Sequence, residues 1–479
     1  MIRSLRTIYS PVFPKVVVYM LQTTEYQIGK YLKWLWSVKD YTTVIHRKSL
    51  VLTGPSRALL VAIGAGMTVQ YIGSLGWAIW VILKGDIFLI GYPLAMLLLT
   101  PAIWAHLVII PLLFGKYLII KPSHYFHIHR SKDAFSIHSA FKIAVAGSYG
   151  KTTMKEMLLT VLSEGKKVAA TPANENVAIS HARFAKRLTG EEDILIIEFG
   201  EGAPGDIAKF AKVTKPNLAI ITGLAPAHLD KYKTVKKAGE DIFSLSEYLN
   251  ESEIYVNGES SAALPFIRSG HNIYSSKSVV GWVIKNIKVS INGVIFDMKK
   301  KNKTLRIKSK LLGAHQVGPL ALVAALSEEL GLSTSDIETG IAKIEPFEHR
   351  MQPRNSSGAW ILDDTYNGNI DGMKAGLQLL KELPAKRKIY VTPGLVDQGP
   401  ESDAIHEELG VLIAKSNPDI AVLMKHSVTT DIKRGLEKGS YKGKTIIEDD
   451  PLDFYNNIDK FIASGDLLLM QNDWPDNYS

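Results

Sequence analysis

The stretch that decides the fold is Phe141–Glu156, FKIAVAGSYGKTTMKE. Its first part, Lys142–Ala146, is a short apolar run of the kind that forms a buried parallel strand, and Thr152–Leu162 has the composition of a helix. Gly147 and Gly150 allow the backbone to turn back with its N–H groups facing inward. The stretch therefore predicts a strand, a phosphate-binding turn and the start of a helix.

The turn also contains the residue types that phosphate chemistry requires. Lys151 is placed to reach the terminal phosphates of a nucleotide, and the hydroxyl of Thr152 is placed to ligate Mg²⁺. The spacing is GxxGKTT, which lacks the first glycine of the GxxxxGK[ST] pattern. A tight strand–helix turn without a ligand is the alternative. We expect phosphate binding, because GKTT between a strand and a helix is typical of that function.

Length and composition limit the remaining possibilities. The chain has 479 residues, of which 46% are hydrophobic and 22% charged, so it is long and apolar enough for two or three globular domains. It contains no cysteine, which excludes disulfides, thiolate zinc sites and a cysteine nucleophile. The net charge is +9, but the basic residues are spread out, with one dense group at Lys299–Lys310. We interpret that group as a solvated strand pair and expect no nucleic-acid partner.

The first 121 residues have a different character from the rest of the chain. Ala58–Leu83 has no charged residue over 26 positions and Ile87–Gly115 has none over 29. Each segment could cross a hydrocarbon core of about 30 Å, so we predict a membrane-anchoring region at 1–121 with two transmembrane helices. A buried hairpin of a soluble domain is the alternative, but neither segment has a polar stripe. Both outer flanks are basic, which places both ends in the cytoplasm.

From Phe141 onward, apolar strand patterns alternate with helical ones, which predicts a doubly wound parallel sheet. We expect strands at Lys167–Thr171, Asp193–Phe199, Asn217–Thr222 and Glu253–Asn257, with helices between them at Val177–Leu188, Gly205–Ala211 and Val235–Asn250. Ligands of such sheets bind at the carboxyl ends of strands, where Asn174, Asn176, Glu198 and His228 are expected. Glu198 ends an apolar strand, and a carboxylate is costly to bury alone. A metal cation beside it is our prediction, and a lysine partner is the alternative.

A second α/β unit begins near Glu348. We expect strands at Trp360–Asp363, Lys388–Val391, Asp419–Met424 and Asp466–Met470, with helices at Asp371–Leu380, Glu401–Ala414 and Pro451–Ala463. The first of these strands ends in DDTYNGN, where two acids, a tyrosine and two asparagines predict further site residues, with a capped turn as the alternative. Between the two units, Val279–Leu312 alternates with a period of two and predicts an antiparallel appendage. The predicted architecture is a membrane hairpin, a P-loop central ATPase domain at 139–347 and a Rossmann-like α/β domain at 348–479.

Short motifs are spread along both α/β units. In order, they are GSYGKTT at Gly147–Thr153, TPANEN at Thr171–Asn176, EFGEGAPGDI at Glu198–Ile207, TGLAPAHLD at Thr222–Asp230, LLGAHQV at Leu311–Val317, HR at His349–Arg350 and DDTYNGNIDGM at Asp363–Met373. In this order they resemble the motifs of the Mur ligase family, and the resemblance extends from about Phe141 to Met470. The DxYNxN form of the last motif is most similar to the branch that adds D-alanyl-D-alanine to the UDP-N-acetylmuramoyl tripeptide.

The resemblance implies an ATP-dependent ligase that forms a C–N bond. In that family a substrate carboxylate attacks the γ-phosphate of ATP, and an amine then displaces phosphate from the resulting acyl phosphate. The implied cofactors are ATP and Mg²⁺. The implied partners are a muramyl-peptide precursor of the cell wall and an amino acid or dipeptide. Positioning and charge neutralisation are the main tasks of the protein in such a reaction.

Site residues are implied by their position in the motifs. The implied catalytic residues are Lys151, His228 and Arg350, with Arg350 approaching the γ-phosphate when the C-terminal domain closes. The implied metal ligands are Thr152, Glu198 and His228. The residues implied to bind the nucleotide are Gly147, Ser148, Gly150, Lys151, Thr152, Thr153, Asn174, Asn176, Gln316, Arg350, Asp364, Tyr366 and Asn367.

The chain also departs from the family pattern. After AHLD the family usually has a carbamylated lysine, where this chain has KKAGEDIF, so we expect Glu240 or Asp241 to provide the carboxylate that helps to hold a second metal ion. The adenine motif is GAHQVGP, in which Gln316 retains an amide and Pro319 does not. The family's LGDMxELG is replaced by TPGLVDQG, and its domain that grips the uridine nucleotide is absent, with the membrane hairpin in its place.

We therefore predict a membrane-anchored ligase of cell-wall precursor synthesis. It would lie at the inner or plasma membrane of a bacterium, with membrane lipid as a partner and the catalytic domains in the cytoplasm. Three alternatives stay open. The same chemistry could act on poly-γ-glutamate or a cyanophycin-like peptide, or on a lipid-linked precursor, or the protein could be a nucleotide-binding scaffold without turnover.

Overall fold

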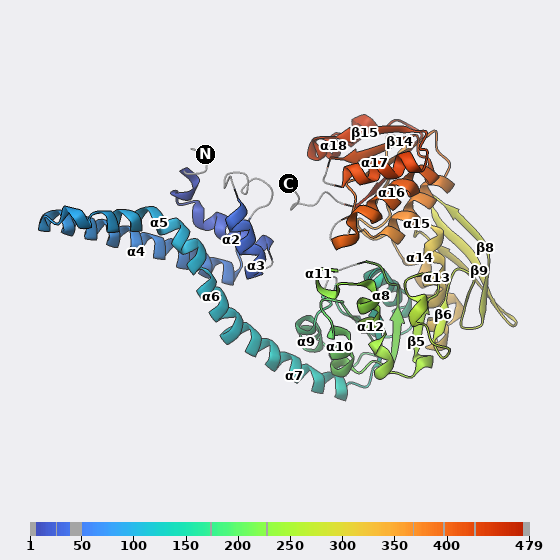
Figure 1. Cartoon of the computed structure of the whole chain (residues 1–479). Helices are drawn as coiled ribbons and strands as arrows, with labels where there is room; N and C mark the ends of the chain where they lie inside the picture. Colours follow the sequence, from blue (N-terminus) through green and yellow to red (C-terminus); the bar gives the residue numbers. More distant parts are fainter. Residues whose placement is uncertain are drawn as a thin grey trace. The chain divides into compact units, whose positions relative to one another are not determined.

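A computed structural model describes residues 6–24, 26–38, 50–172, 175–226, 229–366, 368–395, 398–425 and 428–472 (Figure 1). Three of the predicted site residues, Asn174, His228 and Asn367, lie outside these described residues. The chain divides into two compact units, Met1–Phe126 and His127–Ser479, which are described separately below.

The first unit is helical. Its elements are α2 (Phe13–Thr23), α3 (Ile28–Ser37), α4 (Gly54–Lys84) and a run of helical turns made of η2 (Ile87–Leu89), α5 (Gly91–Leu107), α6 (Ile109–Phe114), η3 (Gly115–Ile120) and the start of α7 (Lys121–Ile137). Thr53 caps the start of α4 by accepting from the Ser56 amide, and Gly85 ends it in a left-handed conformation. Figure 1 shows α4 and α5 side by side, and a core that includes Val17, Tyr31 and Ile63 joins them to α2 and α3.

Two helical segments of the described chain, Gly54–Lys84 and Ile87–Ile137, are long and apolar enough to cross a membrane. Length and composition are the whole of that criterion, and a core helix of a soluble protein can also meet it. In each segment, however, only 22% of the most apolar window is buried by the rest of the chain. Leu83 and Phe88, at the turn between α4 and α5, are 81% and 101% exposed.

A ten-stranded sheet forms the first part of the second unit, in the order β10-β9-β8-β7-β6-β5-β4-β1-β3-β2. The strands are β1 (Phe141–Ala146), β2 (Val168–Ala170), β3 (Ile194–Glu198), β4 (Leu218–Ile221), β5 (Ile254–Asn257), β6 (Asn272–Tyr274), β7 (Ser278–Val279), β8 (Trp282–Ser290), β9 (Gly293–Lys300) and β10 (Lys303–Ser309). Neighbours from β2 to β6 pair in parallel and those from β6 to β10 antiparallel, which confirms both the predicted parallel sheet and the antiparallel appendage.

Helices cover both faces of the parallel part of this sheet. Ile143 and Val145 of β1 face a core under α8 (Lys151–Leu162), α13 (Val317–Glu329) and α14 (Thr334–Lys343). Ala144 and Ala146 face the opposite core, under α9 (Ala178–Ala185), α10 (Asp206–Thr214) and α12 (Val235–Ile242). Because β1 is covered on both sides, the four residues from Ile143 to Ala146 are all apolar.

One predicted helix, Val235–Asn250, is shorter than expected. α12 ends at Ile242, and a 3₁₀ helix, η4 (Phe243–Glu247), follows it. The hydroxyl of Ser244 donates to the Asp241 carbonyl at 2.6 Å, a local side-chain bond of the kind that competes with regular α-helix bonding.

The second sheet has six strands in the order β11-β12-β16-β13-β14-β15. The strands are β11 (Gln352–Ser356), β12 (Ala359–Asp364), β13 (Arg387–Thr392), β14 (Ile420–Met424), β15 (Lys444–Glu448) and β16 (Asp466–Gln471). All pairs are parallel except β11 with β12. One face packs against α15 (Ile370–Glu382), α16 (Ser402–Ser416) and α17 (Thr429–Lys438), and the other packs against α18 (Pro451–Asn456) and α19 (Ile458–Phe461).

A buried lysine joins α8 to the strands beside it. Lys155 is fully buried, and its Nζ donates to the Thr171 carbonyl at 2.7 Å. The same Nζ lies 3.4 Å from Oε2 of Glu198, the last residue of β3, which is 2% exposed. Because two opposite charges share this interior, each compensates part of the cost of burying the other.

We predict that Lys155→Met destabilises the protein by about 3–5 kcal/mol, because it leaves the Glu198 carboxylate buried without this cation. The shift in the midpoint of denaturant unfolding measures the effect. Lys212→Met is the matched control, since Lys212 is exposed on α10, and it should change stability by less than about 0.5 kcal/mol. Equal midpoints for the Lys155→Met variant and the parent protein would contradict the prediction.

Candidate active site

The loop between β1 and α8, here called the glycine loop (Gly147–Gly150), requires glycine at both ends. Gly147 has φ +136° and Gly150 has φ +75°. A Cβ atom on Gly147 would lie 2.4 Å from Oγ1 of Thr222 and 2.9 Å from the Gly223 carbonyl oxygen. The amide of Ser148 donates to that carbonyl at 2.7 Å. The loop is therefore held tightly against the segment after β4, and a side chain at Gly147 would separate them.

Lys151, the first residue of α8, folds back over the glycine loop. Its Nζ donates to the Gly147 carbonyl at 2.5 Å and lies 3.5 Å from Oε2 of Glu201. The hydroxyl of Ser148, in the same loop, is buried without a hydrogen-bond partner among the described residues. An ammonium group, a buried hydroxyl and a helix N-terminus at one loop fit the polyphosphate of a nucleotide. Lys151, Ser148 and the start of α8 provide these three groups.

Thr152 and Glu198 meet at the end of β3. Oγ1 of Thr152 donates to Oε1 of Glu198 at 3.1 Å, and Nδ2 of Asn176 lies 3.4 Å from the same oxygen. The hydroxyl and carboxylate oxygens match the ligands that Mg²⁺ prefers. Oε2 of Glu198 faces Lys155, so the lysine partner that the sequence left as an alternative is present. Thr152 and the Oε1 side of Glu198 could still hold a cation.

Sequence reasoning missed Lys155, although a signal was available. Lys155 is four residues after Lys151 and three before Leu158, so helical periodicity places it on the face of α8 that packs inward. A lysine on such a face needs an anionic partner, and Glu198 at the end of an apolar strand was the obvious candidate.

The two acids proposed in place of the carbamylated lysine point in different directions. Glu240 is exposed on α12, whereas Asp241 is 8% exposed. Asp241 accepts from the Gly205 amide and from the Tyr232 hydroxyl, each at 2.7 Å. Burial raises the pKa of Asp241, and these two hydrogen bonds oppose the rise. Asp241 therefore fixes the start of α10, and the described residues contain no group of three or more metal-ligating His, Asp or Glu side chains.

Glu201 is a second buried acid that the sequence analysis did not select. It is 3% exposed and follows Glu198 by three residues in the EFGEGAPGDI motif. Burial raises the pKa of its carboxyl group, and the Lys151 ammonium and the nearby Ser148 hydroxyl oppose this shift. A second glutamate so close to a predicted strand end was a signal that could have been used.

The second group of predicted residues lies in the six-stranded unit. The Arg350 guanidinium lies 4.2 Å from the centre of the Tyr366 ring, a cation–π contact. Asp364 accepts from the Met351 amide at 3.1 Å and from Nε2 of Gln471 at 2.8 Å. Burial raises the pKa of Asp364 to about 7. Asp364 thus fixes the backbone next to Arg350, and Tyr366 fixes its side chain.

Gln316, the predicted adenine contact, lies in η7 (Ala314–Gln316) at the start of α13. It is partly exposed, and its Nε2 lies 3.0 Å from Nε2 of the neighbouring His315. Its amide is therefore placed near the protein surface, where a ligand could reach it.

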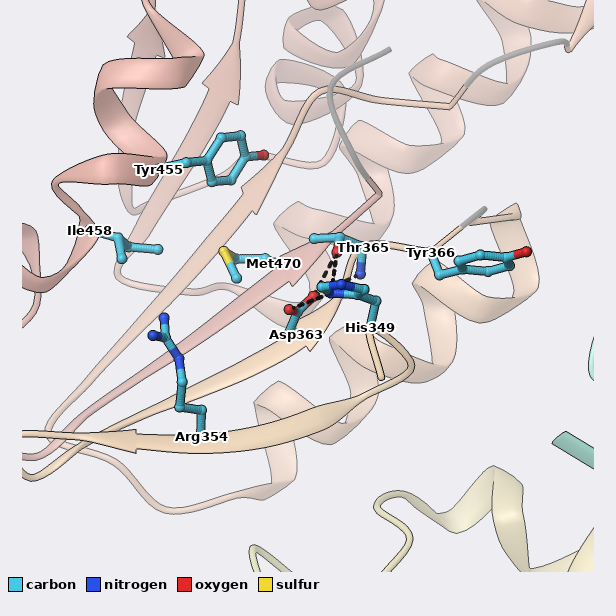
Figure 2. Close-up of a pocket in the computed structure, with 8 residues that line it drawn as sticks. All are labelled: His349, Arg354, Asp363, Thr365, Tyr366, Tyr455, Ile458 and Met470. Carbon is cyan, nitrogen blue, oxygen red and sulfur yellow. Dashed lines mark hydrogen bonds and ion pairs between the residues drawn. The ribbon is translucent and has the colours of Figure 1, made fainter. Parts of the chain in front are cut away.

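A pocket of about 340 Å³ lies beside this second group (Figure 2). Its lining residues are His349, Arg354, Asp363, Thr365, Tyr366, Tyr455, Ile458 and Met470. Asp363 is committed to its neighbours, because Nδ1 of His349 lies 2.9 Å from Oδ2 and the Thr365 hydroxyl donates to Oδ1 at 2.7 Å. Figure 2 shows the Arg354 guanidinium on the side of the pocket near Ile458. The pocket therefore offers a cation next to apolar walls, a combination suited to a small anion with an aliphatic part.

Comparisons with known proteins agree with this geometry. The Mur ligase middle domain matches residues 145–327, and the Mur ligase, glutamate ligase domain matches residues 349–471. A UDP-N-acetylmuramoyl-tripeptide–D-alanyl-D-alanine ligase of Escherichia coli is 30% identical over 282 residues, covering 56% of this chain and 61% of the relative. The ligase of the same name from Haemophilus influenzae is 28% identical, covering 58% and 62%. The match thus spans about three fifths of the length of these relatives.

Solved structures show the same fold. MurF from Acinetobacter baumannii aligns with a TM-score of 0.64 at 19% identity, covering 73% of this chain and 77% of that chain. MurF from Thermotoga maritima, in complex with ADP, aligns with a TM-score of 0.61 at 22% identity, covering 73% and 80%. The two matched domains, the shared fold and the glycine loop lead to one conclusion: the chain belongs to the Mur ligase family.

Proposed function

We propose that the protein is an ATP- and Mg²⁺-dependent ligase that joins D-alanyl-D-alanine, or a similar amine donor, to a muramyl-peptide precursor of the cell wall. The observation that carries the proposal is the arrangement of Lys151, Thr152 and Glu198 around the glycine loop. The names of the Escherichia coli and Haemophilus influenzae relatives support the choice of substrates. The division of the chain into 1–121, 139–347 and 348–479 is part of the same proposal.

The chain's own residues would divide the work of the reaction. A carboxylate of the acceptor attacks the γ-phosphate, ADP leaves, and the amine then displaces phosphate from the acyl phosphate. Lys151 would neutralise charge on the phosphoryl group that is transferred, and Thr152 with Glu198 would hold Mg²⁺, which would supply further positive charge to the phosphates. His228 and Glu240 are assigned as further metal ligands, and Glu240 is exposed on α12. Arg350 would meet the γ-phosphate from the second domain.

The remaining predicted contacts would position the nucleotide. Gly147, Gly150 and Thr153 would present backbone and hydroxyl donors to the phosphates, and Asn174 and Asn176 would line the cleft. Gln316, Asp364, Tyr366 and Asn367 would lie near the base and ribose. The pocket with Arg354 supports an amine donor that has a carboxylate and short aliphatic side chains, which D-alanyl-D-alanine has.

A specific observation favours action at a membrane. The surfaces of α4 and α5 near Gly85 are apolar and exposed, and a monomeric soluble protein rarely exposes a contiguous apolar patch of this kind. Lipid would cover this surface, with the basic flanks on the cytoplasmic side of a bacterial membrane. We therefore assign the hairpin as an anchor and a lipid-linked muramyl peptide as an acceptor the protein can reach.

The first experiment measures ADP release by the full-length protein in detergent with ATP, Mg²⁺, an acceptor and D-alanyl-D-alanine. ADP should form only when both substrates are present. Lys151→Ala should lower the rate by about 100-fold or more, because it removes charge that neutralises the transferring phosphoryl group. Lys167→Ala is the control, since Lys167 is exposed and pairs with Glu191 on the surface. An unchanged rate in Lys151→Ala would show that the glycine loop is not the phosphate site.

The second experiment tests the membrane assignment. The full-length protein in liposomes should use a lipid-linked acceptor faster than its UDP-linked counterpart, because the enzyme and the lipid-linked acceptor are then held at the same surface at a raised local concentration. Deletion of residues 1–121 should remove the preference and leave the rate with the UDP-linked acceptor in solution unchanged. Equal rates for the two acceptors with the full-length protein would refute the assignment.

A further inference from the structure

Glu201 has no role in the function proposed above, yet its carboxylate lies at the glycine loop. Its Oε2 atom is buried and has no hydrogen-bond partner among the described residues. The cation beside it is Lys151, at 3.5 Å. Lys151 is also the group that the phosphates of a nucleotide would need. The carboxylate and the phosphates would therefore compete for one ammonium group.

The neighbouring acids do not compete with phosphate for Lys151. Glu198 is paired with Lys155, a fully buried lysine one turn further along α8. Asp241 is satisfied by the Tyr232 hydroxyl and the Gly205 amide, so it brings no cation toward Glu201. Glu201 thus differs from them, because the cation that compensates its charge is Lys151, which the phosphates would also need.

Electrostatics then determine which form of the nucleotide can bind. A free polyphosphate would bring several negative charges next to a buried carboxylate in a region of low dielectric constant, where like charges repel strongly. It would also draw Lys151 away from Glu201. A nucleotide that arrives with a divalent cation brings two positive charges that can compensate both anions. Only the nucleotide that is complexed with a divalent cation leaves both the carboxylate and the phosphates neutralised.

We propose that Glu201 makes the site select the cation-complexed nucleotide and reject the free polyanion. The proposal rests on nucleotide binding at the glycine loop and adds a specificity-determining residue to that site. In thermodynamic terms, Glu201 couples nucleotide binding to divalent-cation binding, so removing its charge weakens the coupling.

The experiment measures the ADP affinity of the full-length protein by titration calorimetry, once with EDTA and once with saturating Mg²⁺. For the parent protein, Mg²⁺ should strengthen ADP binding greatly. Glu201→Gln should bind ADP about tenfold or more tightly in EDTA, because the repelling charge is gone and Lys151 is free for the phosphates. Its gain in affinity on adding Mg²⁺ should shrink by a similar factor.

Two further variants separate this effect from a general disturbance. Glu201→Asp retains the charge and should keep the strong Mg²⁺ dependence. Glu201→Ala removes the charge without introducing an amide, and it should behave like Glu201→Gln. Asp206→Asn is the matched control, because it removes one negative charge from the same segment, where Asp206 pairs with the exposed Lys209. It should behave like the parent protein.

The outcomes distinguish this inference from the proposed function. If the parent protein binds ADP in neither condition, the proposed function and the inference both fail. If it binds ADP but the neutral variants show the parent's affinity in EDTA and the parent's Mg²⁺ dependence, the proposed function stands and the role of Glu201 is refuted. A Glu201→Asp variant that matches Glu201→Gln would also refute it.

Discussion

The ion pair between Lys155 and Glu198 is the constraint on which the rest of the site depends. It joins α8 to the ends of β2 and β3, and it does so inside the core, where neither charge could remain alone. Because the pair fixes α8, it also fixes Lys151 and Thr152 on the preceding turn. The glycine loop can then be short and tight, since both of its ends are held. In the second sheet, Asp364 holds the backbone beside Arg350 by accepting a hydrogen bond from the Met351 amide.

The charged groups around the glycine loop differ in their partners and in how deeply they are buried. Lys155 is fully buried beside Glu198, whereas Lys151 lies beside Glu201 at the loop where we propose that phosphate binds. Glu198 and Glu201 are three residues apart in sequence and lie near the same strand end, yet they face different lysines. Under the function proposed above, an anion site built in this way would take up its nucleotide together with a divalent cation.

Much of the fold could be predicted from the sequence, because apolar periodicity determines it. The apolar run from Ile143 to Ala146 indicated a buried parallel strand, and the period-two alternation of Val279–Leu312 indicated the antiparallel strands β8 to β10. β15 and α17 were missed because their polar surfaces hide the apolar pattern, and Val235–Asn250 was predicted too long because Ser244 interrupts it. Motif order predicted the site's composition, but the partners of Glu198, Asp241 and Glu201 depend on tertiary contacts that periodicity does not encode.

The proposed ligase activates a carboxylate as an acyl phosphate at the glycine loop. Transfer of an oxygen isotope reports on this step, because the acceptor's carboxylate oxygen becomes the bridge to phosphorus and leaves with the phosphate. The acceptor is prepared with ¹⁸O in both carboxylate oxygens, and the phosphate released with ATP and D-alanyl-D-alanine is analysed by mass spectrometry. We expect one ¹⁸O atom in each phosphate and one in each amide. Phosphate without ¹⁸O, formed at the rate of product, would contradict the acyl-phosphate mechanism.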